Sequence, residues 1–310
     1  MSASRIGLGF ALLGTSNAAP ISDAEADAMF ATAWDLGIRR FDTAQLYGGG
    51  QSEERLGRLL SGIPRDSYVL SSKTGRFRDY ACLVTDPMGN PGDWHDYGRE
   101  TTRRSIEASL ERLGTDRLDI AFIHDCDHHV EEALSGALPE LRKMQEEGII
   151  GRIGCGSNVA ATHEALLAHA DLDILMVAGR LTLLDQSAAE MLLPLTRARD
   201  ITLELAAPFN SGILAAGPDD ATARFDYQAP SDPIRSRARE IEGVCRAHGV
   251  SLRRAALHYP LAHPGVARLV LGLIHPQGLR DNIADLEKPV PAALWADLAE
   301  IGIPAPYAPA

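Results

Sequence analysis

The chain has 310 residues, of which 45% are hydrophobic and 23% are charged, proportions that are ordinary for a globular protein with a sizeable core. A net charge of −12, the lack of a basic run and an aromatic content of 5% argue against nucleic acid or an anionic membrane surface as the main partner. No apolar run approaches the roughly 20 residues that cross a bilayer, so we expect a soluble enzyme or binding protein.

Short apolar runs alternate along the chain with segments of helical period. Eight strands are predicted, at Gly9–Leu13, Ile38–Asp42, Tyr68–Ser72, Leu118–His124, Ile149–Cys155, Ile174–Ala178, Ile201–Ala206 and Ala267–Leu271. Eight helices are predicted, at Asp23–Leu36, Ser52–Leu60, Arg99–Leu113, Val130–Glu147, Ala160–His169, Ser187–Arg199, Ser231–His248 and Gly278–Asp285. Repeated βα units indicate a parallel sheet, and we predict one α/β domain over residues 1–310, a single (β/α)8 TIM barrel.

Three segments interrupt this alternation. Residues 76–98 form a long loop after the third strand, and residues 210–233 form another after the seventh. An extra helix is predicted at Pro291–Ile301, near the C-terminus. Loops that follow strands of such a barrel lie at its carboxyl-terminal face, where active sites are built, so we expect both loops to border the substrate.

The cysteines and the N-terminal segment bear on the compartment. Cys82, Cys126, Cys155 and Cys245 form no Cys-x-x-Cys pair, which favours a reducing, cytoplasmic location over a disulfide framework or a zinc finger. Arg5 and the apolar residues 6–13 faintly resemble a signal peptide, but glycines interrupt the run. We expect a first buried strand there instead.

Polar side chains stand at the ends of three successive predicted strands. Asp42 ends the second strand and Tyr47 lies in its loop, before a triple glycine. Lys73 ends the third strand and His124 ends the fourth. Because these strand ends are neighbours in a barrel, the four side chains should surround one pocket.

This set of residues suits proton transfer at a carbonyl or alcohol. A free phenol has a pKa near about 10, a nearby ammonium lowers it, and a carboxylate keeps the ammonium charged and oriented. We therefore predict Tyr47 as the general acid or base, Lys73 as the group that tunes it and Asp42 as the group that orients Lys73. A neutral His124 would orient the substrate by a hydrogen bond to its reacting oxygen.

Together these motifs resemble the aldo-keto reductase superfamily over essentially the whole chain. The matching residues are Phe41-Asp42-Thr43-Ala44, Tyr47-Gly48, Ser52-Glu53, Leu56-Gly57, Lys73, Asp119-Ile120, His124 and Gly154-Cys155-Gly156-Ser157-Asn158. The resemblance implies hydride transfer with NAD or NADP. Segments at residues 124–127, 178–186 and 209–214 are similar to its sugar 1-dehydrogenase branch, which implies oxidation of an aldose of the L-fucose, D-threo-aldose or L-galactose type at C1 to the lactone, with Tyr47 as the base.

The same resemblance implies which residues contact the cofactor. These are Ser157 and Asn158 after the fifth strand, Phe209, Asn210, Ser211, Gly212 and Leu214 after the seventh, and Gly272, Asp281 and Asn282 after the eighth. Ser157 and Asn158 would hold the nicotinamide carboxamide, although both residue types also suit a helix cap. The loop after the seventh strand would wrap the pyrophosphate, and Asp281 and Asn282 would bind adenosine.

Departures from the family pattern bear on the choice of cofactor. Gly272 and Gly278 stand where NADP-preferring relatives often carry Lys and Arg, so a 2′-phosphate near Asp281 would lack compensating charge unless Arg280 supplies it. NAD is therefore the preferred cofactor, with NADP possible. Ala178 and Ala206 replace the Gln and the aromatic residue that many relatives place around the nicotinamide.

Other functions remain open at this point. NADPH-dependent reduction of aldehydes or ketones, or oxidation of pyridoxal at C4, would use the same four residues. The segment His124–His129 contains His, Cys and Asp, which would suit a metal-dependent hydrolase on the same fold, but consecutive side chains diverge and we predict no metal. A cofactor-binding regulator, like the potassium-channel β subunits, has no supporting feature. The sequence leaves the particular sugar and the oligomeric state undefined.

Overall fold

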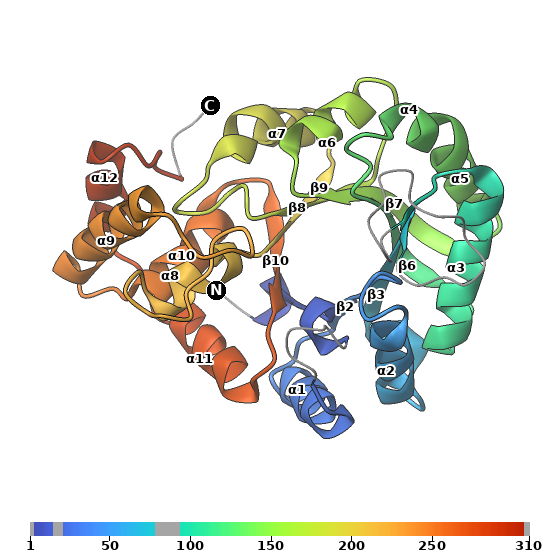
Figure 1. The fold of residues 1–310 in the computed structure, drawn as a ribbon, viewed down its shortest axis with the longest axis horizontal. Coiled ribbons are helices and arrows are strands. Elements are labelled where there is room, and N and C mark those ends of the chain that lie inside the picture. The colour runs from blue at the N-terminus through green and yellow to red at the C-terminus, as the bar shows by residue number, and fades with distance from the viewer. Residues whose placement is uncertain (1–2, 15–20, 78–93, 307–310) are drawn as a thin grey trace.

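The computed structural model describes residues 3–14, 21–77 and 94–306. Its eight longest parallel strands close into a barrel with the order β1-β10-β9-β8-β7-β6-β3-β2, and helices surround them (Figure 1). The barrel strands are β1 (Ile6–Gly9), β2 (Arg40–Asp42), β3 (Val69–Thr74), β6 (Leu118–His124), β7 (Ile150–Ser157), β8 (Ile174–Ala178), β9 (Thr202–Ala206) and β10 (Val266–Gly272). The predicted (β/α)8 barrel is confirmed.

The position of the first strand was predicted wrongly. β1 covers Ile6–Gly9, and Ala11–Leu13 form a 3-10 turn where the sequence predicted a strand. Phe10 donates its amide to Asp42 O at 2.8 Å, after which the chain turns and Leu13 N bonds to Phe10 O at 3.0 Å. Phe10 and Leu13 are both buried, so the apolar run in the sequence continues past the end of the strand. The apolar pattern therefore does not show where the strand ends.

Most helices agree with the sequence patterns. They are α1 (Asp23–Asp35), α2 (Gln51–Leu60), α3 (Arg99–Leu113), α4 (Val130–Glu132), α5 (Leu138–Glu146), α6 (Ala160–Leu167), α7 (Ser187–Ala198), α8 (Ile213–Ala216), α9 (Asp232–Ala247), α10 (Leu252–Ala262), α11 (Pro276–Glu287) and α12 (Ala292–Glu300). Ser22 and Glu25 form a capping box that starts α1. A π-helical turn at Ala133–Ala137 joins α4 to α5. Among the helices of the described residues, none has the length and apolarity to cross a membrane.

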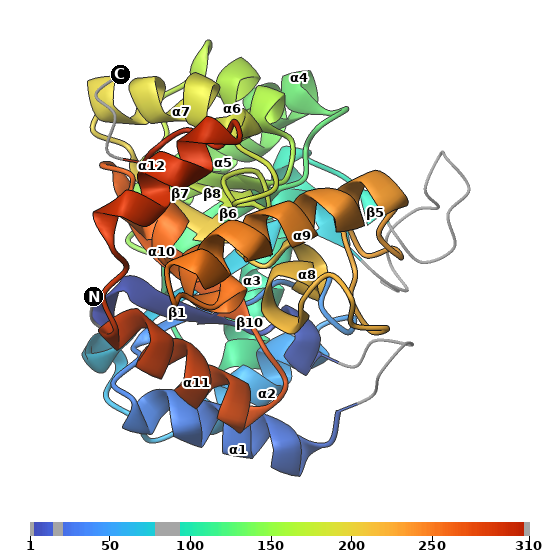
Figure 2. The same cartoon turned by 90° about the vertical axis from the view of Figure 1, so that its left-hand side faces the viewer.

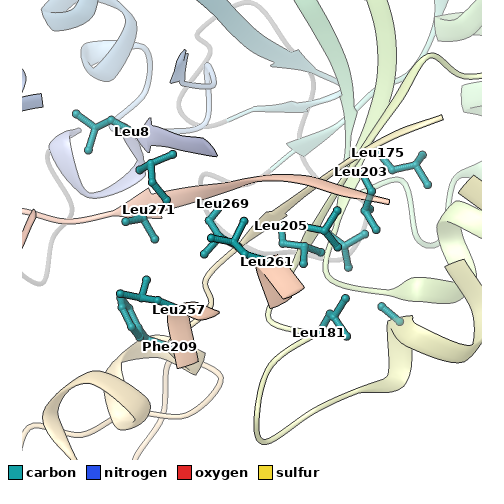
Figure 3. Packing of buried hydrophobic residues seen from close by; sticks show 14 of the residues in the cluster. Leu8, Leu175, Leu181, Leu203, Leu205, Phe209, Leu257, Leu261, Leu269 and Leu271 are labelled. Carbon is teal, nitrogen blue, oxygen red and sulfur yellow. The ribbon is translucent and has the colours of Figure 1, made fainter. Parts of the chain in front are cut away.

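The helix that covers the barrel between β9 and β10 was missed. The predicted helix at Ser231–His248 is α9, but α9 packs on α10 and α12, whereas α10 lies against β10 (Figure 2). Residues 255–262 of α10 are all buried, so the segment has no polar face to reveal a helical period. Leu257 and Leu261 of α10 pack with Leu205 and Leu269 of the strands (Figure 3).

Both long loops contain some regular structure. The loop after β3 begins with β4 (Arg76–Phe77) and ends with β5 (Trp94–His95), which pair as an antiparallel ribbon. The remainder of that predicted loop, residues 78–93, lies outside the described residues. The loop after β9 contains a 3-10 turn at Asn210–Gly212, then α8 and a hairpin closed by Phe225 and Gln228. Figure 2 shows β5 and α8 at the same end of the barrel.

The interior of the barrel has an apolar layer and a charged floor. The apolar layer consists of Ile120, Phe122, Ile174, Met176 and Val270. The charged floor consists of Arg40, Glu204 and Arg268, from β2, β9 and β10. Glu204 is fully buried and pairs with Arg40 at 2.8 Å and with Arg268 at 2.7 Å. Barrel interiors are usually filled by branched apolar side chains, so this floor is an unusual feature of the molecule.

Replacing Gly57 with alanine should destabilise the protein by about 1–3 kcal/mol, because overpacking moves the backbone. A Cβ at Gly57 of α2 would lie 2.4 Å from Arg112 O in α3. Urea denaturation would measure the loss. Gly243→Ala is the matched control, since a Cβ at this position in α9 meets nothing within 4 Å and should stabilise the helix slightly. Equal stability of the two variants would contradict the expectation.

Candidate active site

The structure brings Asp42, Lys73, Tyr47 and His124 together at the carboxyl ends of β2, β3 and β6, which are neighbours in the barrel. Lys73 Nζ donates to Asp42 Oδ2 at 2.5 Å and to Thr43 O at 2.9 Å. The same ammonium lies 4.9 Å from the centre of the Tyr47 ring. The Tyr47 ring meets the His124 ring edge-on, with centroids 5.9 Å apart. The four polar side chains thus lie close together at one edge of the barrel.

The loop that carries Tyr47 is held by small residues. Gly48, Gly49 and Gly50 all have positive φ, between 63° and 96°, which turns the chain sharply into α2. A Cβ at Gly14 would lie 2.8 Å from the Tyr47 carbonyl, so the preceding loop presses directly on the Tyr47 backbone. These contacts fix the backbone from which the phenol projects.

The acid and hydroxyl that follow the triple glycine attach α2 to the barrel. Ser52 Oγ bonds to Thr43 Oγ1 at 2.7 Å and donates to Phe10 O at 3.0 Å. Glu53 is fully buried and accepts hydrogen bonds from Ser72 and from Arg112. Ser52 and Glu53 therefore hold the Tyr47 loop in place from behind, without facing the barrel interior themselves.

The net effect on the Tyr47 phenol differs from the one we predicted. Burial raises the pKa of Tyr47 to about 12; Lys73 opposes this with its charge and a hydrogen bond, while Asp42 adds to the rise. Burial lowers the pKa of Lys73, but Asp42 and Tyr47 raise it by more, so the ammonium stays charged. The predicted direction of the Lys73 influence is confirmed, but the prediction of a lowered pKa for Tyr47 is wrong, because desolvation of the phenolate outweighs the ammonium.

Tyr97 supports the strand end that carries His124, and sequence analysis missed it. Its hydroxyl donates to His124 O at 2.7 Å, and its side chain is fully buried. A Cβ at Gly75 would lie 2.1 Å from the Tyr97 ring, so the ring packs directly on the backbone at the end of β3. The loop after β3 contains several aromatic residues, and their spacing alone does not show which of them is buried.

A pair of charges lies beside His124. Arg76 Nη1 donates to Asp125 Oδ2 at 2.5 Å, and the same carboxylate oxygen is 3.6 Å from His124 Nε2. Asp125 has a φ of +47°, an uncommon conformation for a residue other than glycine. Such strain is frequent at functional sites, and here it directs the carboxylate toward the ribbon of β4 and β5.

The two residues predicted to hold the nicotinamide lie at the end of β7. Ser157 Oγ donates to Asp127 Oδ1 at 2.7 Å and accepts from Val159 N at 2.9 Å. Asn158 is half-buried, and its carbonyl accepts from Arg180 Nε at 2.9 Å. Val159 occupies the cap position of α6, so the alternative of a capping role for Ser157 or Asn158 does not hold.

The loop after β9 has the features of a ligand cradle. Asn210, Ser211 and Gly212 have φ values of 46°, 63° and 119°, and Phe209 and Leu214 anchor the loop in the core. Asn210 Nδ2 donates to Gly179 O at 3.0 Å, but its buried Oδ1 has no hydrogen-bond partner among the described residues. A strained loop with an unsatisfied buried amide oxygen fits a polar cofactor at this edge.

Gly272 ends β10 and leaves open space, since a Cβ there would first meet Leu12 at 3.9 Å. Asp281 and Asn282 lie on α11, and Asn282 is buried. Asp281 accepts from Gln277 at 2.8 Å and from Arg253 at 3.5 Å. Arg280, the residue that might have bound a 2′-phosphate, instead donates to Thr32 of α1 at 3.2 Å.

Tyr227 is an exposed aromatic residue at the tip of the hairpin after α8, and sequence analysis did not single it out. Its side chain is 78% exposed, and both Asp226 and Tyr227 have positive φ, at 45° and 64°. Arg180 holds the tip by contacts of 3.2 Å to Asp226, and Ser211 Oγ accepts from Tyr227 N at 3.1 Å.

The side chains of His124–His129 have separate partners. Asp125 binds Arg76, Asp127 binds Ser157 and Thr162, and His129 stacks on His95 with centroids 5.3 Å apart. Within residues 3–14, 21–77 and 94–306 no three His, Cys, Asp or Glu side chains converge as metal ligands.

The chain belongs to the Aldo/keto reductase family, whose model matches residues 5–303, and its closed barrel agrees with that family. The protein is thus an oxidoreductase of a family that uses a nicotinamide cofactor. The hydrolase alternative is therefore wrong.

Two characterised relatives and one solved structure are similar to this chain. A D-threo-aldose 1-dehydrogenase from a Pseudomonas species is 40% identical over 292 residues, covering 90% of this chain and 88% of that protein. A pyridoxal 4-dehydrogenase from Microbacterium luteolum is 35% identical, covering 96% and 94%. An aldo-keto reductase from Bacillus halodurans, solved in its holo form, superimposes with a TM-score of 0.77 at 22% identity, covering 96% and 91%, and confirms the fold.

Proposed function

We propose that this protein is an NAD-dependent dehydrogenase that oxidises an aldose at C1 to the lactone. The observation that carries the proposal is the cluster in which Lys73 joins the Asp42 carboxylate to the Tyr47 phenol, with His124 alongside. The 40% identity to a D-threo-aldose 1-dehydrogenase supports an aldose as the substrate.

Each of the four residues has a distinct task in this reaction. Tyr47, as the phenolate, removes the proton from the C1 hydroxyl of the cyclic sugar, and Lys73 stabilises the phenolate charge. Asp42 keeps Lys73 charged and directed, and His124 orients the C1 oxygen by a hydrogen bond. Bound NAD supplies the acceptor for the hydride that leaves C1 as the C1–O bond becomes a carbonyl. One proton and one hydride leave the sugar, which yields the lactone.

Residues at the ends of β7, β9 and β10 would hold the cofactor across the barrel mouth. Ser157 and Asn158 would contact the nicotinamide carboxamide, the loop from Phe209 to Leu214 the pyrophosphate, and Asp281 and Asn282 the adenosine. NAD is preferred because Gly272 and Gly278 offer no cation and Arg280 is directed to Thr32. A 2′-phosphate beside Asp281 would be poorly compensated.

The protonation state of Tyr47 favours a second candidate, reduction of an aldehyde or ketone with NADPH. Because burial raises the pKa of Tyr47 to about 12, the phenol is neutral near pH 7 and is ready to donate a proton. In the oxidative direction the phenol must first lose its proton, so the rate of sugar oxidation should rise with pH through the alkaline range. Comparison of kcat/KM for oxidation with NAD and for reduction with NADPH, both at neutral pH, therefore separates the two candidates.

Initial rates across a panel of substrates test the proposal. We expect the highest kcat/KM for an aldose among L-fucose, L-galactose, D-arabinose and L-xylose with NAD, and lower values with NADP. Pyridoxal is the comparison substrate, since one relative is a pyridoxal 4-dehydrogenase. Activity with pyridoxal alone, or only in the reductive direction with NADPH, would contradict the proposal.

A further inference from the structure

A chain of hydrogen bonds runs through the barrel interior from the charged floor to Asp42. Asp42 Oδ2 faces Lys73, while Asp42 Oδ1 accepts from Ser71 Oγ at 2.5 Å. Ser71 Oγ in turn accepts from Arg40 Nη1 at 2.8 Å. The exposed fractions of Asp42, Ser71 and Arg40 are 3%, 0% and 2%, so water does not compete for these bonds.

Strand alternation explains how these side chains meet. Arg40 and Asp42 are two residues apart on β2, and Ser71 and Lys73 are two residues apart on β3, so all four point into the barrel. β2 and β3 pair with Asp42 opposite Ser71. Polar groups inside a barrel are costly unless they are hydrogen-bonded, and each bond here satisfies a buried group.

Arg40 is held rigidly below Ser71. It donates to Glu204 Oε1 and Oε2 at 3.1 and 2.8 Å and to Phe41 O at 2.6 Å. A Cβ at Gly7 of β1 would lie 2.9 Å from Arg40 Cγ, so the neighbouring strand leaves space for this side chain and no more. Arg268 shares Glu204, so the two guanidinium groups exceed the single carboxylate by one positive charge.

We propose that Ser71 and Arg40 are positioning residues for the proton transfer at Tyr47. Together they hold the Asp42 carboxylate so that Oδ2 stays on Lys73, and they draw negative charge toward Oδ1, away from Lys73 and the phenol. The inference rests on the proposed role of Tyr47 as the proton-transfer group.

The direction of the effect follows from the charges around the phenol. The charged and titratable groups around Tyr47 are Lys73 on β3, Asp42 on β2, and His124 and Asp125 at the end of β6. Without the Ser71 hydroxyl, the Asp42 carboxylate would draw more strongly on Lys73, and less of the positive charge of Lys73 would act on the phenolate. Tyr47 would then lose its proton only at higher pH.

Ser71→Ala tests the inference. We expect kcat for oxidation to fall about tenfold, which corresponds to one lost hydrogen bond to a buried carboxylate, while the dissociation constant of the cofactor stays unchanged. The pH profile of kcat should shift to higher pH. Thr196→Val is the matched control, because Thr196 is also buried but its hydroxyl donates to Leu193 O within α7, away from the Tyr47 loop.

The outcomes separate a positioning role from a structural one. If Ser71→Ala and Thr196→Val lose thermal stability alike and keep the same kcat and pH profile, the inference is overturned. The double variant Arg40→Met/Glu204→Gln removes both partners of the floor pair and should shift the profile in the same direction as Ser71→Ala. An unchanged profile in this double variant would overturn the part assigned to Arg40.

A parallel assay of Tyr47→Phe distinguishes the failure of this inference from that of the proposed function. If Tyr47→Phe retains its rate, the proposed function fails. If it is inactive while Ser71→Ala behaves like its control, only the positioning inference fails.

Discussion

Tyr47→Phe is expected to lower kcat by about a thousandfold or more while cofactor binding stays nearly intact, because the phenol hydroxyl is the group that we propose exchanges a proton with the substrate. The ring of the variant would still fill the space beside Lys73 and His124, so the pocket should keep its shape. Initial rates and a fluorescence titration with reduced cofactor measure the two quantities separately.

Tyr68→Phe is the matched control for this variant. Tyr68 is also buried, but it packs edge-on against Phe41 on the outer side of the barrel, with centroids 6.4 Å apart. Removal of the Tyr68 hydroxyl should leave kcat unchanged. If Tyr47→Phe kept most of its rate, the assignment of Tyr47 as the proton-transfer group would be wrong.

Lys73→Met should lower kcat by about 10²- to 10⁴-fold, since the phenolate of Tyr47 would lose its cation. It should also lower the free energy of unfolding by about 3–5 kcal/mol, because Asp42 would remain buried without an opposite charge beside it. The 2.5 Å contact between Lys73 and Asp42, with both side chains almost fully buried, is the basis for this expectation. Denaturation curves and initial rates would measure the two effects.

The double variant Lys73→Met/Asp42→Asn separates these effects. It removes both charges, so stability should recover in large part while activity stays low. Recovery of activity along with stability would show that Lys73 contributes to the fold alone and that the proposed mechanism is wrong.

The alternation of strands and helices predicted the barrel, and the polar residues at the strand ends predicted the cluster at its carboxyl-terminal face. Parallel strands place their carboxyl ends at one face, so Asp42, Lys73 and His124 had to converge once the βα alternation was recognised. The helix α10 was not predicted because residues 255–262 are all buried. A helical period is visible in a sequence only when one face of the helix is apolar and the other is polar.

Two other features depend on distances that a sequence does not contain. Arg40 and Glu204 are 164 residues apart in the chain, so only the closed barrel reveals that they pair. The pKa of Tyr47 depends on how much water the folded site excludes, which outweighs the nearby ammonium. The structure brings the groups of the motif together, and their charge states depend on the packing around them.

The charged floor has a consequence for how the chain folds. Arg40 lies on β2 and Glu204 on β9, strands that are separated in the barrel by β1 and β10. An N-terminal fragment that stops before β9 would have to bury Arg40 without its carboxylate or leave that part of the barrel open to water. The ion pair therefore stabilises only the completed ring of strands. This favours a single cooperative folding transition over the stepwise assembly of half-barrels.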